Sequence, residues 1–331
     1  MLLKLFKQSI PQVIVIIFLL AILLWLKSCF TDLINPYYFE SISMPFYSII
    51  KSWISNNVLL GRVITFIVLL FTGFYLLQIN SKHIVIKQRT YLLSFFYIIL
   101  ISSLISLQQL NPAVFAAFFM VFAIDHILTI YHKEVVLDNL FRAGFYIAVA
   151  SLFYAPIIFY IIAALLSIIS IRSFNVREWF ALFFGLITPW FFYFFYNYFF
   201  NNDLMAVINT LKSNLLTEVN NDYNSVLHYL FYAYSLLLFI ITGFYLVKTI
   251  STEKISVRKF HGAFFWFNLV SLLIFMVVPT VSNEILYLAF IPIVFQFTHY
   301  FTASKLKFWP NFLFILLFVF SILMQFYSGS S

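Results

Sequence analysis

Five polar residues of this chain of 331 residues could do chemistry together. Asp32 and Glu40 are acids eight positions apart, and a carboxylate so placed can act as general base towards an acceptor hydroxyl. Arg62 and Lys51 could hold a phosphate leaving group through charge-assisted hydrogen bonds, with His228 as a further substrate-binding residue. The alternatives are ordinary acids on a solvated loop, an interfacial histidine and an arginine that extends to lipid phosphates.

The composition indicates where such chemistry would take place. The chain is 64% hydrophobic and 9% charged, with a mean hydropathy of +1.02, whereas soluble domains are about 25% charged. These values exclude a water-soluble globular protein and a disordered one. Unbroken apolar runs also exclude a membrane β-barrel, whose strands alternate. The sequence therefore predicts an all-α fold, a polytopic transmembrane helical bundle that forms a single integral membrane domain over residues 1–331.

Several classes of site are excluded by what the sequence does not contain. The single cysteine, Cys29, rules out a disulfide framework. Metal-ligand spacings, a nucleotide-binding loop and a G-x-S-x-G elbow do not occur, and only seven glycines are present. We therefore expect no cofactor and no ATP-driven activity. The isoelectric point near 9.4 does not indicate nucleic acid as a partner, because the basic residues gather in loops on one side of the membrane.

Apolar runs predict the membrane-spanning helices and the lipid bilayer as partner. They fall at about 9–26, 57–78, 90–107, 113–131, 143–171, 178–200, 225–247, 262–279, 284–302 and 310–327. The fifth run is ambiguous, because Pro156 could break it into two short helices. If the fifth run is a helical hairpin, the chain has about eleven helical segments.

The distribution of lysine and arginine favours the hairpin, because cytoplasmic loops carry an excess of these residues. With a hairpin, one side of the membrane receives Lys27, Lys51, Arg62 and Lys212. The other side receives the remaining 15 of the 19 basic residues: Lys4, Lys7, Lys82, Lys87, Arg89, Lys133, Arg142, Arg172, Arg177, Lys248, Lys254, Arg258, Lys259, Lys305 and Lys307. The sequence thus predicts a bacterial cytoplasmic (inner) membrane protein with its N-terminus in the cytoplasm and its C-terminus outside.

Two outer loops contain amphipathic patterns. In Pro45–Ile54, apolar residues recur at helical spacing with Ser48, Lys51 and Ser52 between them, which predicts an interfacial helix. The loop at 200–224 is polar, and its core, Leu204–Leu216, has a similar helical pattern. Whether this second loop covers a site or lies in water is open.

The pentapeptide Thr-Gly-Phe-Tyr-Leu occurs at 72–76 and again at 242–246. Each copy ends a helix that is followed by a basic loop and an aromatic-rich helix. Two parallel repeats, at about 1–171 and 172–331, would explain why the pentapeptide occurs twice, as would chance in a chain rich in Phe, Tyr and Leu.

Asp125 and His126 are ionisable residues within the fourth apolar run. Adjacent helical positions point about 100° apart, so the two cannot share one narrow face. A satisfied hydrogen bond between helices and a proton relay are the two hypotheses for this pair.

The central region has a series of motifs. They are Arg142-Ala143-Gly144-Phe145, the stretch from Ala150 to Pro156, an aliphatic helix ending at Arg172, then Arg177-Glu178-Trp179 and Gly185-x-x-x-Pro189-Trp190. This region resembles that of the C-type glycosyltransferases. Asp32 best matches the acidic residue that follows the first helix of those enzymes. The chain departs from the family pattern in having Ala155 before the proline, and in lacking paired acids in the first loop. It also resembles uncharacterised aromatic-rich bacterial membrane proteins.

The resemblance implies a polytopic enzyme that transfers a sugar from a polyprenyl-phosphate donor at the outer face, or a degenerate relative of one. Asp32 would be the base, Glu40 would assist, and Arg62 with Lys51 would hold phosphate. A transporter or flippase built from repeats is the second hypothesis, supported by the two copies of the pentapeptide. A non-catalytic subunit with a partner in an envelope complex is the third.

Overall fold

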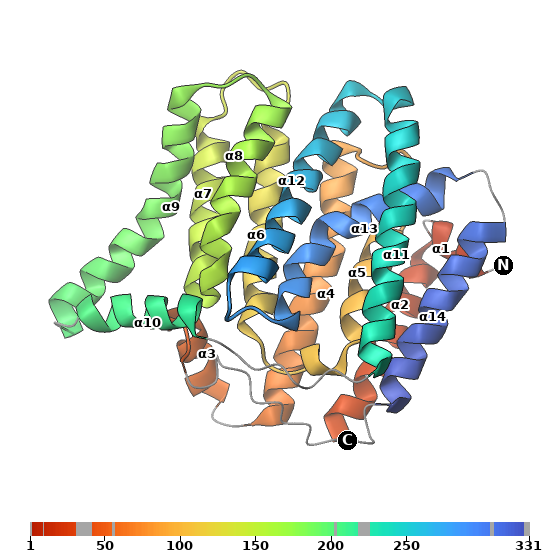
Figure 1. The fold of residues 1–331 in the computed structure, drawn as a ribbon, viewed down its shortest axis with the longest axis horizontal. Helices are drawn as coiled ribbons and strands as arrows, with labels where there is room; N and C mark the ends of the chain where they lie inside the picture. Colours follow the sequence, from red (N-terminus) through yellow and green to blue (C-terminus); the bar gives the residue numbers. More distant parts are fainter. Residues whose placement is uncertain are drawn as a thin grey trace.

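The computed structural model describes residues 2–8, 10–30, 42–54, 57–201, 204–217, 226–304 and 308–327, and this part of the chain is an assembly of helices (Figure 1). The α-helices are α1 (Leu2–Lys7), α2 (Pro11–Phe30), α3 (Pro45–Ile54), α4 (Val58–His83), α5 (Leu92–Ser102), α6 (Pro112–Thr129), α7 (Leu137–Phe153), α8 (Tyr160–Ile171), α9 (Val176–Tyr196), α10 (Leu204–Leu216), α11 (Val226–Thr249), α12 (Ile255–Val277), α13 (Leu286–Ala303) and α14 (Phe308–Tyr327). Short helical turns link some of them: η2 (Ile105–Leu107), η3 (Ala155–Phe159), η4 (Asn197–Asn201), η5 (Ile250–Thr252) and η6 (Asn283–Ile285).

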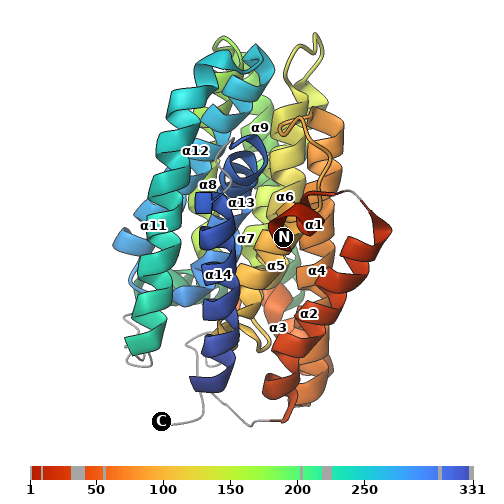
Figure 2. The ribbon, with the colours of Figure 1, turned by 90° about the vertical axis from the view of Figure 1, so that its right-hand side faces the viewer.

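The longer helices run between two ends of the bundle (Figures 1 and 2). We call one the basic end, which carries the connections at 84–91, 130–136, 172–175 and 250–254. The opposite end carries α3, α10 and the connections at 103–111, 154–159 and 278–285. Within the described ranges, eight helices are long and apolar enough to cross a membrane, and α5 and the η3–α8 segment are shorter apolar helices. The predicted polytopic helical bundle is confirmed.

The ambiguous fifth apolar run is a broken hairpin. Helix α7 ends at Phe153, Tyr154 has an extended backbone, and η3 with Pro156 turns the chain into α8. The two arms pack on different partners, α7 on α6 and α9 and α8 on α12, so the break separates them. Helix α7 begins at Leu137, whereas the apolar run begins near 143. The first turns of the helix contain the charged residues Asp138 and Arg142, so they do not appear in a hydropathy pattern.

Helices α5, α6 and α13 form the centre of the bundle. Every residue of α5 is buried, as expected for a helix that is apolar on all sides. The few polar groups here find partners inside the protein. Tyr97 donates its hydroxyl to the carbonyl oxygen of Tyr287 at 3.0 Å, and the Tyr287 hydroxyl donates to Leu107. These bonds tie the middle of α5 to the start of α13.

Glycines allow α7 and α9 to approach each other at backbone distance. A Cβ atom on Gly144 would lie 2.1 Å from the carbonyl oxygen of Leu182, and one on Gly185 would lie 2.0 Å from that of Phe141. The two helices run in the same direction, from the basic end to the opposite end (Figure 1). Small residues allow such contacts between membrane helices, which gain little from the hydrophobic effect. The glycines of the resemblance motif therefore have a packing role.

We expect Gly144→Ala and Gly185→Ala to destabilise the protein, because each methyl group would meet backbone atoms that cannot move alone. Overpacking of this kind costs about 1–3 kcal/mol or more. The measurement is the fraction of monodisperse protein left after a heat challenge in mild detergent. Gly243→Ala is the control, since its Cβ would meet only the flexible Gln296 amide, at 3.2 Å. Equal survival of all three variants would contradict the close α7–α9 contact.

Candidate functional site

The sequence-predicted site residues fall at the opposite end or outside the described residues. Asp32 and Glu40 lie outside them. Lys51 is on α3 and His228 is in the first turn of α11, and both are half-buried. The roles assigned to these four residues stay predictions.

Arg62 is buried, with 3% of its surface exposed, so the idea that it extends to lipid phosphates is wrong. Its Nη1 donates a hydrogen bond to the carbonyl oxygen of Ser28, in the last turn of α2. The Gln108 amide also binds this part of α2, donating a hydrogen bond to the carbonyl oxygen of Leu24. Burial places the guanidinium between two helices, where it fixes the last turn of α2 against α4.

Further polar bonds join these helices to α5 and α14. The Trp25 indole donates to the Ser102 hydroxyl at 3.0 Å, and the Gln325 amide donates to the Ser102 carbonyl at 2.9 Å. Lys27 donates to the carbonyl oxygen of Gln325. The helix that leads to Asp32 in the sequence is thus held on three sides, by α4, α5 and α14.

Glu284, just before α13, is fully buried. Its carboxylate accepts hydrogen bonds from the Tyr154 hydroxyl at 3.0 Å, from the Ser282 backbone N–H at 3.0 Å and from the Ser282 hydroxyl. Tyr154 is the residue at which α7 breaks. The carboxylate therefore fastens the turn before α13 to the break in the hairpin, a link between residues 130 positions apart in the chain.

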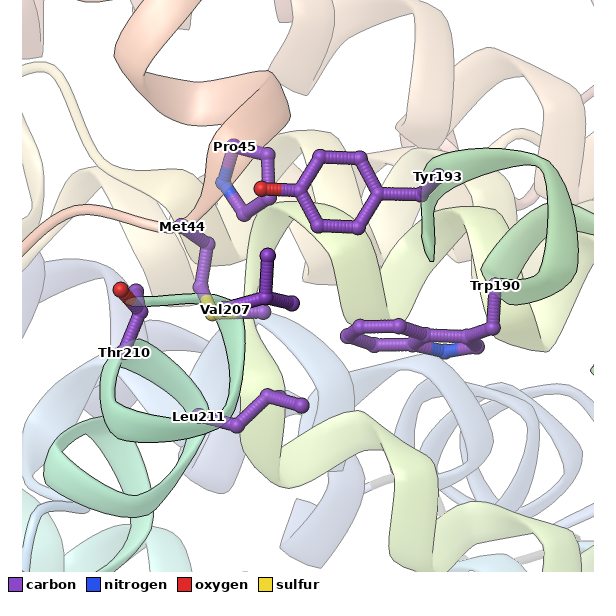
Figure 3. Close-up of a pocket in the computed structure, with 7 residues that line it drawn as sticks. All are labelled: Met44, Pro45, Trp190, Tyr193, Val207, Thr210 and Leu211. Atoms are coloured by element: carbon purple, nitrogen blue, oxygen red, sulfur yellow. The ribbon is translucent and has the colours of Figure 1, made fainter. Parts of the chain in front are cut away.

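Helices α3, α9 and α10 meet in a packed joint at the opposite end (Figure 3). Met44 and Pro45 contribute from the start of α3, Trp190 and Tyr193 from α9, and Val207, Thr210 and Leu211 from α10. The space between these side chains is too small for a water molecule. Trp190 is anchored by its indole N–H, which donates to the Ser151 hydroxyl at 2.9 Å. The joint holds both amphipathic helices across this end, where the sequence predicted them.

A second polar cluster lies near the basic end, around Asp125 on α6. Lys82 donates to both carboxylate oxygens, at 3.0 and 2.9 Å, the Tyr75 hydroxyl donates at 3.1 Å, and His83 Nε2 lies at 2.6 Å. All three partners come from α4. The hypothesis of a satisfied bond between helices is confirmed for Asp125.

His126 faces a different helix from Asp125, as the angle between adjacent helical positions predicted. Its ring stacks on Tyr146 of α7, and its Nδ1 lies 3.4 Å from Asn139. The two neighbours therefore serve two interfaces, α6 with α4 and α6 with α7.

The described residues contain no group of three or more His, Cys, Asp or Glu side chains that could hold a metal ion. No protein-family model, curated protein or solved structure matches this chain. The function must therefore be argued from the residues themselves.

We expect Asp125→Asn to lower the free energy of unfolding by about 1–3 kcal/mol, because a buried hydrogen-bonding group loses its charged partners. The measurement is thermal unfolding in detergent at constant pH. Asp138→Asn is the matched control: its ion pair with Arg142 lies on the surface, where such pairs contribute about 0–1 kcal/mol. If the two variants unfold at the same temperature, Asp125 does not join α4 to α6 as described.

Proposed function

We propose that this multi-pass membrane protein transfers a sugar from a polyprenyl-phosphate donor to an acceptor hydroxyl, at the end of the bundle opposite the basic loops. The observation that carries the proposal is the contact of buried Arg62 with Ser28, in the last turn of the helix after which Asp32 follows in the sequence. The amphipathic helices α3 and α10 lie across the same end, as suits an enzyme that takes a lipid-linked substrate from the membrane interface.

In this proposal Asp32 accepts the proton of the acceptor hydroxyl, and Glu40 assists it. The hydroxyl oxygen then bonds to the anomeric carbon as the bond from that carbon to the phosphate oxygen breaks. The polyprenyl phosphate leaves with the bonding electrons, and Lys51 stabilises its negative charge, while buried Arg62 holds the last turn of α2, the helix that precedes Asp32 in the sequence. His228 contributes to substrate binding. By the excess of lysine and arginine at the basic end, the reaction takes place on the non-cytoplasmic face of a bacterial inner membrane.

Transport is the second candidate function, and one observation favours it. The tyrosines of the two pentapeptide copies, Tyr75 and Tyr245, both contact the second helix along the chain from their own: Tyr75 binds Asp125 on α6, and Tyr245 packs on Tyr300 of α13. Parallel repeats would produce this correspondence. Against it, Asp125, the carboxylate within the fourth apolar run, already binds Lys82, His83 and Tyr75 and is not free to bind a transported ion.

The test is mass spectrometry of lipids that co-purify with the protein in mild detergent. We expect wild-type protein to be enriched in polyprenyl phosphate or its sugar conjugate. Lys51→Ala should lose this enrichment, because it removes a charge that binds phosphate. Asp32→Asn should retain the lipid but carry more of the sugar conjugate, because binding remains while transfer stops.

Lys212→Ala is the matched control, a cation removed from α10 at the same end. It should retain the lipid. Bulk phospholipid alone in every sample would contradict the proposal. So would Asp32→Asn protein with the wild-type ratio of conjugate to free polyprenyl phosphate.

A further inference from the structure

Three basic residues from three separate elements come together at the basic end, around the loop between α8 and α9: Arg172 and Lys259 through their side chains and Lys133 through its main-chain carbonyl. Arg172, which follows α8, donates from Nη1 to the carbonyl oxygen of Lys133 at 3.1 Å. Lys259, in the second turn of α12, donates to the carbonyl oxygen of Ile171. The Lys259 ammonium also lies 5.8 Å from the centre of the Tyr131 ring. We call Lys133, Arg172 and Lys259 the cation cluster.

The cluster keeps a net positive charge. Its contacts are mainly neutral, main-chain carbonyls and an aromatic ring, and the carboxylate that it binds is Glu178, 3.2 Å from Arg172. Three cations against this one acid leave two positive charges. Of the neighbouring charged residues in the chain, Glu134 is exposed on the first loop, and Arg177 and Arg258 are exposed on the other two elements. The positive charge is therefore concentrated where three connections meet.

A hydrogen-bond donor without a partner in the described part of the chain also lies in the same loop region. Trp179 follows Glu178, and its indole N–H is buried without an acceptor among the described residues. The Trp179 ring packs edge-on against Phe174 at 4.7 Å. Indole groups at the boundary of a membrane commonly donate to lipid headgroups.

The surface that continues from the cluster along the bundle is apolar. Ile169 on α8 and Phe174, Val176 and Phe180 at the start of α9 expose between 47% and 58% of their surfaces. Cations next to an apolar surface suit a molecule that has a phosphate headgroup and hydrocarbon chains. A free anion would not contact the apolar surface.

We propose that the cation cluster binds the phosphate headgroup of an anionic phospholipid, whose acyl chains lie along α8 and α9. Basic pockets between membrane helices bind such headgroups, and arginine suits phosphate through its planar fork. This site lies at the end of the molecule remote from the proposed transferase site, so an experiment that rejects one proposal does not reject the other.

The test is native mass spectrometry of the full chain in detergent, titrated with dioleoylphosphatidylglycerol and, in parallel, with dioleoylphosphatidylcholine. We expect wild-type protein to prefer the anionic lipid. Lys133→Gln with Lys259→Gln should weaken its binding about 25-fold, because each cation near a membrane surface contributes roughly fivefold. Both side chains are at the surface or partly so, and Arg172, which binds buried Glu178, is left in place.

Lys248→Gln is the matched control, an exposed lysine at the basic end of α11, across the bundle from α8 (Figure 1). It should bind the anionic lipid within about twofold of wild type. An equal loss in this control, or none in the double variant, would overturn the proposal. An excess of inorganic phosphate should leave the lipid bound, and complete displacement would show instead a site for free phosphate.

Discussion

Polar groups inside this bundle must find their hydrogen-bond partners within the protein, because hydrocarbon offers none. Three such groups connect helices that are distant in the chain. Arg62 binds the last turn of α2, Asp125 binds three side chains of α4, and Glu284 binds Tyr154 at the break of the hairpin. Since the apolar surfaces match one another and the lipid equally well, these bonds and the glycine contact between α7 and α9 specify which helices are neighbours.

Much of the fold was predictable from the sequence, because the signals are local. Apolar runs located the spans, helical periodicity located α3 and α10, and the excess of basic residues on one side favoured the hairpin that the structure contains. The burial of Arg62 and Glu284 was missed for the opposite reason. Their partners, Ser28 and Tyr154, are distant in the sequence, and a single sequence contains no sign of such pairs. The candidate bases Asp32 and Glu40 lie outside the described residues, so their roles rest on sequence alone.

The two ends of the molecule differ in how their charges are used. The four lysine or arginine ion pairs found among the described residues, and the His83–Asp125 contact, all lie towards the basic end. They join α4 to α6, the loop at 84–91 to that at 250–254, and Arg172 to α9, and one lies within α7. At the opposite end, Arg62 and Lys27 are held by main-chain carbonyls, and amphipathic helices lie across the bundle. This asymmetry supports chemistry at the opposite end and lipid anchoring at the basic end.

The fifth apolar run turns back, so that both of its ends lie at the basic end of the bundle and, in a membrane, on one side of it. Single cysteines at exposed positions test it directly: Glu134→Cys, Ser173→Cys and Ser52→Cys, each in a Cys29→Ser background, labelled with an impermeant maleimide in sealed vesicles of known orientation. We expect Glu134→Cys and Ser173→Cys to react from one side and Ser52→Cys from the other. Labelling of the first two from opposite sides would show a single span and contradict the topology.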